Sequence, residues 1–490
     1  MTIEQVISKF KQTYPLADTS IIEKAYTFAK KVHNGQMRCN GEPTLEHLIQ
    51  TAYVLADLKL DSAALAGGIL HDTLEDTPTS LKQIKQEFGD EIAFLVESVT
   101  FIKKVKYRNQ EKANERNAEK TRKILISMAK DIRVILIKLA DRIHNMKTLY
   151  ALSKERQKRL AFETLEIYAP IAYRLGIGEI KGQLEDLAFY YAYPKEYQTL
   201  LSQVKNRYSK GKNYIENVIP IIRKFLAKEN IPVINIHGRA KHYYSLYKKL
   251  LKYDMDWHRI YDLIAIRIIV PDVESCYATL GAIHKQWKPL IGRIKDYIAT
   301  PKPNSYRSLH TTVFCQNGQI TEFQIRTKQM HEETENGIAA NWYYSEKKNR
   351  TKEKCAICYP SQKLTKEIAL VKQLQEWQKE DFLTPEEFFN SLKIDYLKNR
   401  IFVFTPKGSV IDLPEGATPI DFAYAVHSNI GDDCAGAKIN GKLTRLNSTL
   451  KNGQVVEIII QKNKKPNKDW LNFVKTNRAK ARIRAWYNKN

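Results

Sequence analysis

The N-terminal third of the sequence carries imidazole and carboxylate side chains at positions that suit a metal ion. The full set is His47, His71, Asp72 and Asp141. Imidazole nitrogens and carboxylate oxygens together suit a catalytic divalent cation that keeps open positions. Two further acids, Glu75 and Asp76, follow Asp72 by three and four residues and would share its face of a helix. A lone His-Asp pair is usually a helix cap or a salt bridge, so the prediction depends on the whole set.

A second stretch, residues 293–327, combines residue types that suit a nucleotide. It reads RIKDYIATPKPNSYRSLHTTVFCQNGQITEFQIRT and holds several cations, an aromatic ring at Tyr306 and a carboxylate at Glu322. Lysine suits phosphates, an aromatic ring suits a stacked base, and a carboxylate suits a hydroxyl or a metal. Taken by itself, the stretch has an alternative interpretation as an ordinary hairpin with a solvated face.

Two earlier segments favour the nucleotide interpretation. Residues 237–250, HGRAKHYYSLYKKL, concentrate basic side chains, namely Arg239, Lys241, His242, Lys248 and Lys249. Residues 261–270, YDLIAIRIIV, read as a buried strand that Asp262 and Arg267 interrupt. A charge in an apolar strand costs stability unless it has a partner, a metal or a task.

Helices must position the first set. Residues 1 to about 165 read as helical throughout, and AALAGGILHDTLED at Ala63–Asp76 reads as one helix that ends in acids. In ILIKLADRIHNMKTL, residues 135–149, Asp141 and Asn145 lie four apart on one face. The candidate metal ligands would therefore come from three different helices.

Strands must position the second set. We expect them at about 233–237, 262–270, 311–315 and 320–326. The Asn317-Gly318 step between the last two predicts a hairpin. Because alternate residues of a strand share a face, Glu322 and Gln324 would lie on the same side of the sheet.

Composition bounds the classes of function. The chain has 490 residues, 43% of them apolar, which is enough for several domains with real cores. It has no apolar run long enough to span a membrane and no signal-peptide core in MTIEQVISKFKQTYPL, so we expect a cytoplasmic protein without a membrane partner. The net charge of +25 favours polyanionic partners such as nucleotides and RNA. Cys355 and Cys358 have metal-like spacing, but no second pair completes a zinc site.

The three blocks of the second set, in this order, resemble the synthetase domain of the RelA/SpoT family, whose members make and destroy the alarmone (p)ppGpp in the stringent response. The H…HD…D order of the first set is similar to that of HD-type phosphohydrolases, within flanks like those of the same family. The stretch RIFVFTPKGSVIDLPEG resembles the start of a TGS domain, a small β-grasp module.

The resemblance implies a multidomain α+β chain with an all-α HD-type hydrolase domain and a nucleotidyltransferase-like mixed sheet in the synthetase domain. The implied organisation is a hydrolase domain at 1–165, a helical connector at 166–230, a synthetase domain at 231–345, a linker with a helix at 346–398, the TGS domain at 399–462 and a basic helical tail at 463–490.

For the hydrolase, the resemblance implies that Mn²⁺ is held by His47, His71, Asp72 and Asp141. Glu75 and Asp76 would handle the attacking water, while Arg38 and Asn145 would contact the alarmone. The products would be GDP or GTP and pyrophosphate. Leu48 departs from the family, which commonly has proline after the histidine, and should alter the entry into the helix more than the ligation.

For the synthetase, the resemblance implies transfer of pyrophosphate from ATP to the 3′-hydroxyl of GDP or GTP. Asp262 would bind Mg²⁺, Glu322 would activate the 3′-hydroxyl or share the metal, and Tyr306 would stack on guanine. The ATP phosphates would lie among Arg239, Lys241, Ser245, Lys249 and Arg267. The acceptor would be placed by Lys295, Lys302, Asn304, His310 and Gln324.

The segment RIKD at 293–296 fits the basic form of a family motif that accompanies bifunctional members. Three residues depart from the family pattern, where Gly, Gln and His are usual: Ser305, Arg307 and Asn341. We expect these departures to tune the synthetase and not to abolish it, because Asp262, Tyr306 and Glu322 are all kept.

Two features of the C-terminal part point to RNA. His427 matches the family position that contacts the CCA end of uncharged tRNA on the ribosome, although a packed histidine is an alternative. The tail from Lys462 to Asn490 holds ten Lys or Arg against one acid, Asp469, and WLNFVKTNRAKARIRAWY suits an RNA backbone.

We therefore expect a bifunctional (p)ppGpp synthetase and hydrolase with a tRNA-sensing module. Three rivals stay open: a hydrolase with an impaired synthetase, a tRNA- or ribosome-binding regulator with vestigial catalytic domains, and an RNA-processing enzyme that pairs an HD domain with a nucleotidyltransferase. Opposed activities in one chain would waste ATP, so a conformational switch is expected, with helices 165–230 as the candidate element.

Overall fold

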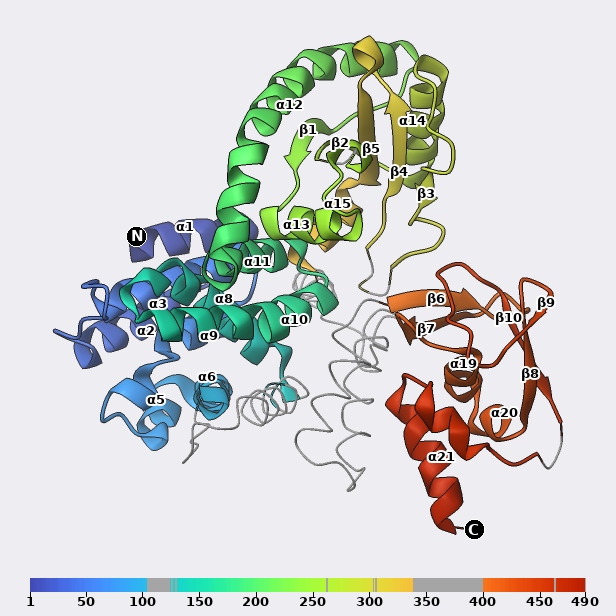
Figure 1. Cartoon of the computed structure of the whole chain (residues 1–490). Coiled ribbons are helices and arrows are strands. Elements are labelled where there is room, and N and C mark those ends of the chain that lie inside the picture. Colours follow the sequence, from blue (N-terminus) through green and yellow to red (C-terminus); the bar gives the residue numbers. More distant parts are fainter. Residues whose placement is uncertain are drawn as a thin grey trace, which may run out of the picture. The chain divides into compact units, whose positions relative to one another are not determined.

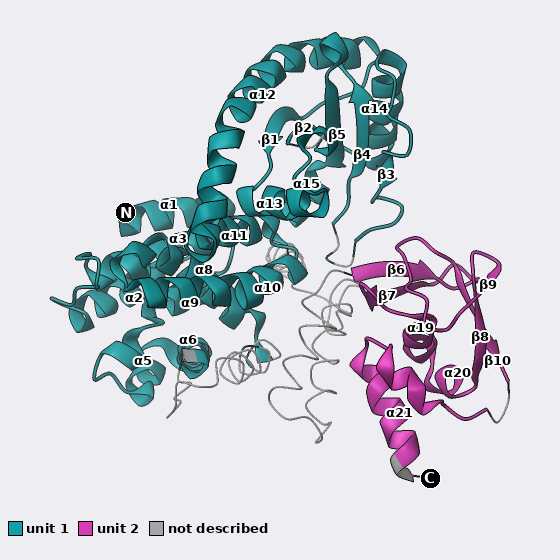
Figure 2. Ribbon diagram, viewed as in Figure 1, with its two compact units in different colours: residues 1–105, 123–377 teal, residues 106–122, 378–490 magenta. Residues whose placement is uncertain are grey.

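The computed structural model describes residues 1–103, 124, 127, 130–260, 263–302, 304, 306–337, 400–461 and 464–489. They fall into two compact units, coloured teal and magenta in Figure 2. The described part of the first unit ends at residue 337, and that of the second unit runs from 400 to 489. The expected linker at 346–398, with Cys355 and Cys358, lies outside the described residues.

The first unit begins with a helical bundle, as the sequence predicted. Its helices are α1 (Ile3–Thr13), α2 (Ser20–Val32), α3 (Thr44–Asp57), α4 (Ser62–Leu70), α5 (Thr73–Asp76), α6 (Leu81–Lys103), α8 (Ile132–Lys147) and α9 (Lys154–Glu163). Asp61 caps α4 by accepting from the Ala64 N–H at 2.7 Å. A Cβ at Gly68 would lie 2.5 Å from Leu55 Cδ1, so glycine allows α3 and α4 to pack closely. This packing brings the candidate ligands on the two helices together.

The stretch Ala63–Asp76, expected as one helix, forms two. α4 ends before His71, and His71 and Asp72 form a turn that leads into the short α5. The N–H groups of Glu75 and Asp76 still donate to the Asp72 carbonyl, at 3.1 and 2.9 Å. The single-helix prediction was wrong at this turn. His71 and Asp72 keep backbone angles of the helical region, so the helical pattern of the sequence continues across the turn and does not reveal it.

A helical connector joins the bundle to a sheet. It consists of a π-helical turn (Thr164–Tyr168), α10 (Ala169–Arg174), α11 (Gly178–Ala192) and α12 (Pro194–Lys228). Arg142 of α8 donates to Glu163 at 2.5 Å and lies 4.1 Å from the centre of the Tyr168 ring, which fixes the π-helical turn to the bundle. α11 packs against α8 and α9 and also against α13 (Tyr243–Lys252) of the sheet region. α12 arches beside the sheet (Figure 1).

The sheet region has five strands in the order β1-β2-β5-β4-β3. They are β1 (Asn235–Ala240), β2 (Ile264–Val270), β3 (Lys295–Asp296), β4 (Leu309–Phe314) and β5 (Ile320–Thr327), with α14 (Val273–Gln286) and α15 (Lys328–Asn336) as further helices. β2 and β5 are parallel and the other neighbours antiparallel, which confirms the mixed sheet. The sequence missed β3, because two residues are too few for a periodic signal, and it placed β1 two residues too early.

β4 and β5 form the predicted hairpin. Asn317 and Gly318 at its tip have positive φ angles of 57° and 72°, a conformation that asparagine and glycine accept more readily than other residues. The register places Glu322 opposite Thr312 and Gln324 opposite His310. The turn thereby fixes which side chains of the two strands meet.

The end of α15 meets the turn between α10 and α11 backbone to backbone. Gly337 has a φ of +55°, and a Cβ there would lie 2.2 Å from the Leu175 carbonyl oxygen. A Cβ at Gly176 would lie 3.1 Å from the Asn304 carbonyl oxygen. Only glycine allows backbones to approach this closely, so the connector turn abuts both α15 and the loop that carries Asn304.

The second unit is a small β-rich domain with a C-terminal helix. Its elements are β6 (Arg400–Phe404), β7 (Val410–Pro414), α19 (Pro419–Val426), α20 (Ser428–Asp432), β8 (Cys434–Ile439), β9 (Lys442–Thr444), β10 (Val456–Ile460) and α21 (Asn477–Lys489). Buried Asp421 accepts from the Thr418 backbone and hydroxyl and from the backbone N–H groups of Lys475 and Thr476. This carboxylate therefore fastens the segment before α21 to α19.

Candidate active sites

The predicted metal ligands meet inside the helical bundle. His47 on α3, His71 after α4 and Asp141 on α8 offer ligand atoms that all lie within 4.8 Å of one another. His47 Nε2 is 3.3 Å from both His71 Nε2 and Asp141 Oδ1. The fourth member, Asp72, places its carboxylate oxygens 3.1 Å from His71 Nε2 and 3.5 Å from His47 Nε2. All four side chains are buried.

Hydrogen bonds behind the two imidazoles aim them at this centre. His71 Nδ1 lies 2.7 Å from the Gly68 carbonyl oxygen, so Nδ1 carries the proton and Nε2 presents a lone pair to the cluster. His47 Nδ1 lies 2.9 Å from His144 Nδ1. A His47 that offers Nε2 as a ligand donates from Nδ1, and His144 is then the acceptor. A ligand imidazole supported in this way is typical of metal sites.

The electrostatics of the cluster also suit a cation. Burial by itself would lower the pKa of His47, but the hydrogen bonds to Asp141 and Asp72 outweigh it and raise this pKa. Burial and the neighbouring His47 lower the pKa of His144 to about 3, which keeps His144 neutral and able to accept. Two oriented imidazoles and two buried carboxylates therefore fit a divalent metal ion.

The predicted nucleotide contacts of the hydrolase adjoin the metal set. Asn145 donates to Asp141, as does Lys138, and Arg38 Nη2 donates to Asn145 Oδ1 at 2.6 Å. The structure thus joins Arg38, from the segment before α3, to α8. The predicted water-handling acids, Glu75 and Asp76, are exposed in α5, one turn after Asp72.

In the sheet region, four predicted acceptor residues form one hydrogen-bonded chain. The Tyr306 hydroxyl lies 2.7 Å from His310 Nε2, and His310 Nδ1 lies 2.8 Å from Glu322 Oε1. Gln324 Nε2 donates to the same carboxylate oxygen at 3.3 Å. Because a carboxylate can only accept, His310 donates from Nδ1 and accepts the Tyr306 O–H at Nε2. Burial lowers the pKa of His310, in keeping with this neutral form.

The predicted lysines and asparagine of the acceptor site surround Tyr306. Lys302 Nζ lies 4.6 Å from the centre of the Tyr297 ring and 4.9 Å from that of Tyr306, which are cation–π distances. Burial and the neighbouring Lys295 lower the pKa of Lys302 to about 8. Asn304 Oδ1 accepts from the Tyr306 N–H at 3.4 Å, and Lys295 pairs with His310 across β3 and β4.

An arginine cluster lies behind the same ring. Arg267 on β2 donates to Glu335 of α15 at 3.0 Å. Arg326 on β5 is fully buried, its guanidinium carbon lies 6.0 Å from the Tyr306 ring centre, and its nearest carboxylate oxygen belongs to Glu335, at 3.8 Å. Burial lowers the pKa of Arg326 to about 10. Within the described part of the chain its guanidinium nitrogens have no hydrogen-bond partner, which marks a site of concentrated positive charge.

The other predicted ATP contacts follow one another from β1 into α13. Arg239 is exposed near the end of β1, and Lys241 comes just before α13. Ser245 lies in the first turn of α13 and Lys249 in its last turn. Ser245 already has partners: its hydroxyl donates to Glu185 of α11 at 3.0 Å and accepts from Lys181 at 3.1 Å.

Three predicted positions fall outside the described residues: Asp262, Ser305 and Asn341. The third departure from the family pattern, Arg307, is described, and it donates to Glu333 of α15 at 2.7 Å. This ion pair gives Arg307 a structural partner without touching Tyr306 or Glu322.

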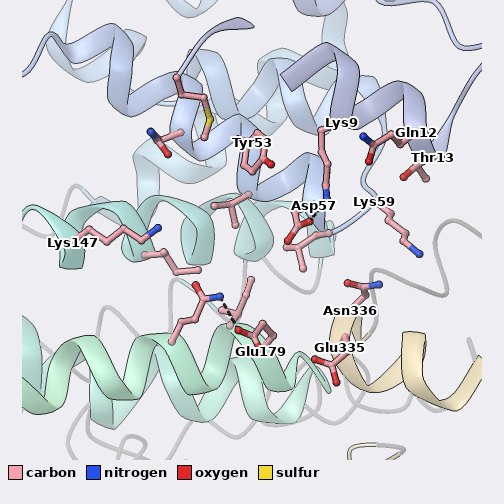
Figure 3. Close-up of a pocket in the computed structure, with 17 residues that line it drawn as sticks. Lys9, Gln12, Thr13, Tyr53, Asp57, Lys59, Lys147, Glu179, Glu335 and Asn336 are labelled. Carbon is pink, nitrogen blue, oxygen red and sulfur yellow. Dashed lines mark hydrogen bonds and ion pairs between the residues drawn. The ribbon is translucent and has the colours of Figure 1, made fainter. Parts of the chain in front are cut away.

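A cavity of about 720 Å³ lies where the bundle, the connector and α15 meet (Figure 3). Its wall includes Lys9, Asp57, Lys147, Glu179 and Glu335. None of the predicted site residues that the structure describes lines this cavity. The cavity wall meets the sheet site only at Glu335, among the lining residues, since Glu335 is the partner of Arg267.

In the second unit, His427 stands between α19 and α20. Its side chain is exposed, and Nδ1 accepts from the Asn429 N–H at 3.2 Å. The alternative of a histidine packed in the core is wrong, because the ring ends one helix and caps the next at the surface.

Some residues at the two sites were not predicted from the sequence. Arg326 interrupts an apolar strand as Arg267 does, so the same signal could have identified it. Glu185 and Glu335 are acidic residues on helices, and their spacing in the sequence does not indicate which residue each one contacts. His144 was not among the predicted site residues, and the structure places its Nδ1 2.9 Å from His47 Nδ1.

Comparison with known proteins gives three matching families. The HD domain matches residues 25–178, the region found in RelA and SpoT proteins matches residues 238–349, and the TGS domain matches residues 401–460. The first two matches cover the two candidate active sites, and the third covers the β6–β10 part of the second unit.

Several curated proteins are similar over nearly the whole chain. A GTP pyrophosphokinase of Myxococcus xanthus is 47% identical over 97% of this chain and 61% of its own length. A guanosine-3′,5′-bis(diphosphate) 3′-pyrophosphohydrolase of Aquifex aeolicus is 43% identical over 100% of this chain and 67% of its own length. A bifunctional (p)ppGpp synthase/hydrolase RelA of Mycobacterium tuberculosis is 42% identical over 99% and 65%. The chain thus spans about three fifths to two thirds of these relatives.

Proposed function

The chain belongs to the RelA/SpoT family, and we propose that it both makes and degrades (p)ppGpp. The observation that carries this proposal is that described residues of both predicted catalytic sets lie together in one chain. One is the buried imidazole–carboxylate cluster around His47, and the other is the chain from Tyr306 to Gln324. Relatives named for each activity, and one named for both, support the same conclusion.

The hydrolytic reaction cleaves the 3′-pyrophosphate of (p)ppGpp with water and yields GDP or GTP and pyrophosphate. A divalent metal, Mn²⁺, would be held by His47, His71, Asp72 and Asp141. When bound, it would lower the pKa of a water molecule. Glu75 and Asp76 would take or hold the proton of the attacking water. Arg38 and Asn145, hydrogen-bonded to each other beside Asp141, would contact the nucleotide.

The synthetic reaction joins the acceptor 3′-oxygen to the β-phosphorus of ATP and breaks the bond from that phosphorus to the α-phosphate oxygen, so AMP leaves. Glu322 would take the proton of the 3′-hydroxyl, while His310 and Gln324 hold its carboxylate in place. Tyr306 would stack on guanine, and Lys295, Lys302 and Asn304 would position the acceptor.

The donor triphosphate needs its charge neutralised for in-line displacement. Among the described residues, the candidates for this task are Arg239, Lys241, Ser245, Lys249 and Arg267. Asp262 would hold Mg²⁺, together with or beside Glu322.

The second unit supports a partner made of RNA. We propose that its exposed His427 stacks on a base of uncharged tRNA and that the basic α21 lies near the RNA backbone, in the context of a ribosome. No helix in the described ranges combines the length and apolar character of a membrane span. We place the protein in the cytoplasm, where ATP, GDP, GTP and tRNA are found.

The experiment that tests the proposal uses purified protein in two reactions. One contains labelled ATP, GDP and Mg²⁺, and the other contains ppGpp and Mn²⁺. We expect turnover in both, loss of synthesis alone in Glu322→Gln, and loss of hydrolysis alone in Asp72→Ala. Hydrolysis without synthesis would show that the protein acts as a hydrolase only. Tight tRNA binding with no turnover in either reaction would support a regulator with vestigial catalytic domains.

A further inference from the structure

Helix α11 of the connector inserts a carboxylate among the groups that the donor phosphates would need. Glu185 Oε2 accepts from the Ser245 hydroxyl at 3.0 Å and from Lys181 Nζ at 2.5 Å. Its other oxygen, Oε1, accepts from Lys248 Nζ at 2.8 Å. Two of these donors, Ser245 and Lys248, lie on α13, in the segment where the ATP phosphates are expected.

The carboxylate is held there in its charged form. Only 4% of Glu185 is exposed. Burial alone would raise its pKa, but the charges of Lys181 and Lys248 outweigh burial and keep the pKa of Glu185 below its ordinary value. A negatively charged group that accepts from a serine and a lysine of one helix reproduces the way a phosphate is bound.

A second acid of α11 fixes the same contact. Asp186 accepts from the Tyr244 N–H at 3.0 Å, at the start of α13, and lies 2.8 Å from His242 Nδ1. A Cβ at Gly182 would lie 2.1 Å from His242 Nε2, so glycine is needed for α11 to approach this closely. The position of α11 against α13 is therefore specified by several residues and not by one ion pair.

We propose that Glu185 is an intramolecular competitor of the donor nucleotide: it occupies the Ser245 hydroxyl and the Lys248 ammonium, and ATP must displace it. This inference rests on the proposed synthetase function. A hydroxyl has one proton and donates to one acceptor at a time, so Ser245 cannot serve Glu185 and a phosphate together. Phosphate carries the same sign of charge as Glu185, so it enters only as α11 withdraws its carboxylate.

The competition gives the connector a chemical means of setting the affinity for ATP. α11 also packs against α8, the helix that carries Asp141 of the hydrolase cluster, and against α9. Displacement of Glu185 is thus a movement of an element that both catalytic regions contact. A purely structural role for Glu185 makes a different prediction, namely lower stability with no gain in ATP affinity.

The test measures binding of a non-hydrolysable ATP analogue, with Mg²⁺, to the full chain. Glu185→Gln keeps the shape of the side chain and removes the charge, and we expect the Kd to fall by about threefold to tenfold, the effect of one or two hydrogen bonds. Glu179→Gln, an exposed acid on the same helix bonded to Gln183, is the matched control and should leave the Kd within about twofold of the wild type.

A second background isolates the shared hydroxyl. In Ser245→Ala, the substitution Glu185→Gln should lower the Kd by a smaller factor than in the wild type, because only Lys248 of the two contested donors remains. If Glu185→Gln folds poorly, Lys181→Met/Glu185→Met removes the whole ion pair, and its Kd should fall by the same factor. The KM for ATP in synthesis should fall with the Kd.

The outcomes separate the two proposals. An unchanged or weaker affinity in Glu185→Gln, at an unchanged melting temperature, would show that Glu185 only anchors α11 and would overturn the competition. A wild type and variants that all fail to bind the analogue would overturn the synthetase function, and the competition with it. Tighter binding in Glu185→Gln, with a smaller gain in the Ser245→Ala background, supports the competition.

Discussion

The bundle site and the sheet site both hold histidines against carboxylates, but they gather them from very different distances along the chain. His47 and Asp141 come from separate helices, and their contact exists only when those helices pack. Tyr306, His310 and Glu322 belong to one hairpin and the loop before it. The first site is therefore a product of tertiary packing, and the second a product of strand register.

The two sites also differ in which protein groups pair with their charged and polar side chains. In the bundle, the Lys138 ammonium and the Asn145 amide that donate to Asp141 belong to its own helix, α8. On the donor side of the sheet region, Ser245 and Arg267 bind acids from α11 and α15. In the roles proposed above, Asp141 Oδ1 faces the two imidazoles where a cation would bind, whereas Glu185 and Glu335 hold groups that anionic phosphates would need. The comparison predicts that variants of the first site will change stability and activity together, and those of the second mainly activity.

The largest effect is expected at Asp141. Asp141→Asn should lower ppGpp hydrolysis on the order of a thousandfold, since a ligand is lost. It also leaves the buried ammonium of Lys138 without its carboxylate, which should lower the free energy of unfolding by about 3 kcal/mol. Hydrolysis assays with Mn²⁺ measure the loss of activity, and thermal unfolding measures the loss of stability. Lys138→Met/Asp141→Leu should regain stability but no hydrolysis; unchanged stability in Asp141→Asn would contradict the packing argument.

The next effect should be confined to one activity. His310→Ala removes the bridge between Tyr306 and Glu322 and should lower synthesis roughly a hundredfold, while hydrolysis and melting temperature stay close to wild type. His284→Ala, which loses a hydrogen bond to Thr311, is the control and should keep synthesis within about threefold. Equal losses in both variants would mean that His310 only supports the sheet.

A smaller effect concerns how the free energy of unfolding depends on pH, through His331 of α15. Burial and Arg326 lower the pKa of His331 to about 4, from a usual 6.5. Because the unfolded chain binds the proton more readily, His331 contributes stability that is present above pH 6.5 and is lost as pH falls toward 4. His331→Gln should therefore lose less stability between pH 7 and 5 than the wild type, by roughly 1 kcal/mol. Parallel melting curves across this range would contradict the shift.

The smallest effect on catalysis is expected in the second unit. His427→Ala should leave unstimulated synthesis and hydrolysis within about twofold, because both sites lie in the first unit. Its affinity for uncharged tRNA should fall by about fivefold or more, the effect of one lost base stack. Filter binding and the two turnover assays measure these. Unchanged tRNA affinity would argue against His427 as a base contact.

Much of the architecture could be predicted because local rules and tertiary structure agree. The Asn317-Gly318 turn sets the β4–β5 register, which puts Gln324 opposite His310, and the two-residue period of β5 puts Glu322 beside Gln324. The spacing of Asp141 and Asn145 gave their contact in the same way. The prediction that the metal set comes from three helices was correct for His47 on α3 and Asp141 on α8, whereas His71 and Asp72 lie in the turn after α4.

What could not be predicted depends on packing between distant segments. The contact between Glu185 and Ser245 joins two helices of separate regions, and an acid on a helix has no sequence feature that names its partner. The turn at His71 was not predicted because its residues keep helical backbone angles. The pairing of Arg267 with Glu335 depends on where α15 lies after β5, which strand periodicity does not report.

The contact of Gly337 with the connector turn has a consequence for inheritance. A side chain at Gly337 would strike the carbonyl of Leu175 and force a left-handed backbone on a residue that resists it. A random screen for loss of alarmone control would therefore recover this glycine repeatedly, although it belongs to neither catalytic set. Many such alleles would be conditional, failing at high growth temperature and recovering when cooled. Under the proposed function, one nucleotide change at this position would disturb the connector that packs against both catalytic regions.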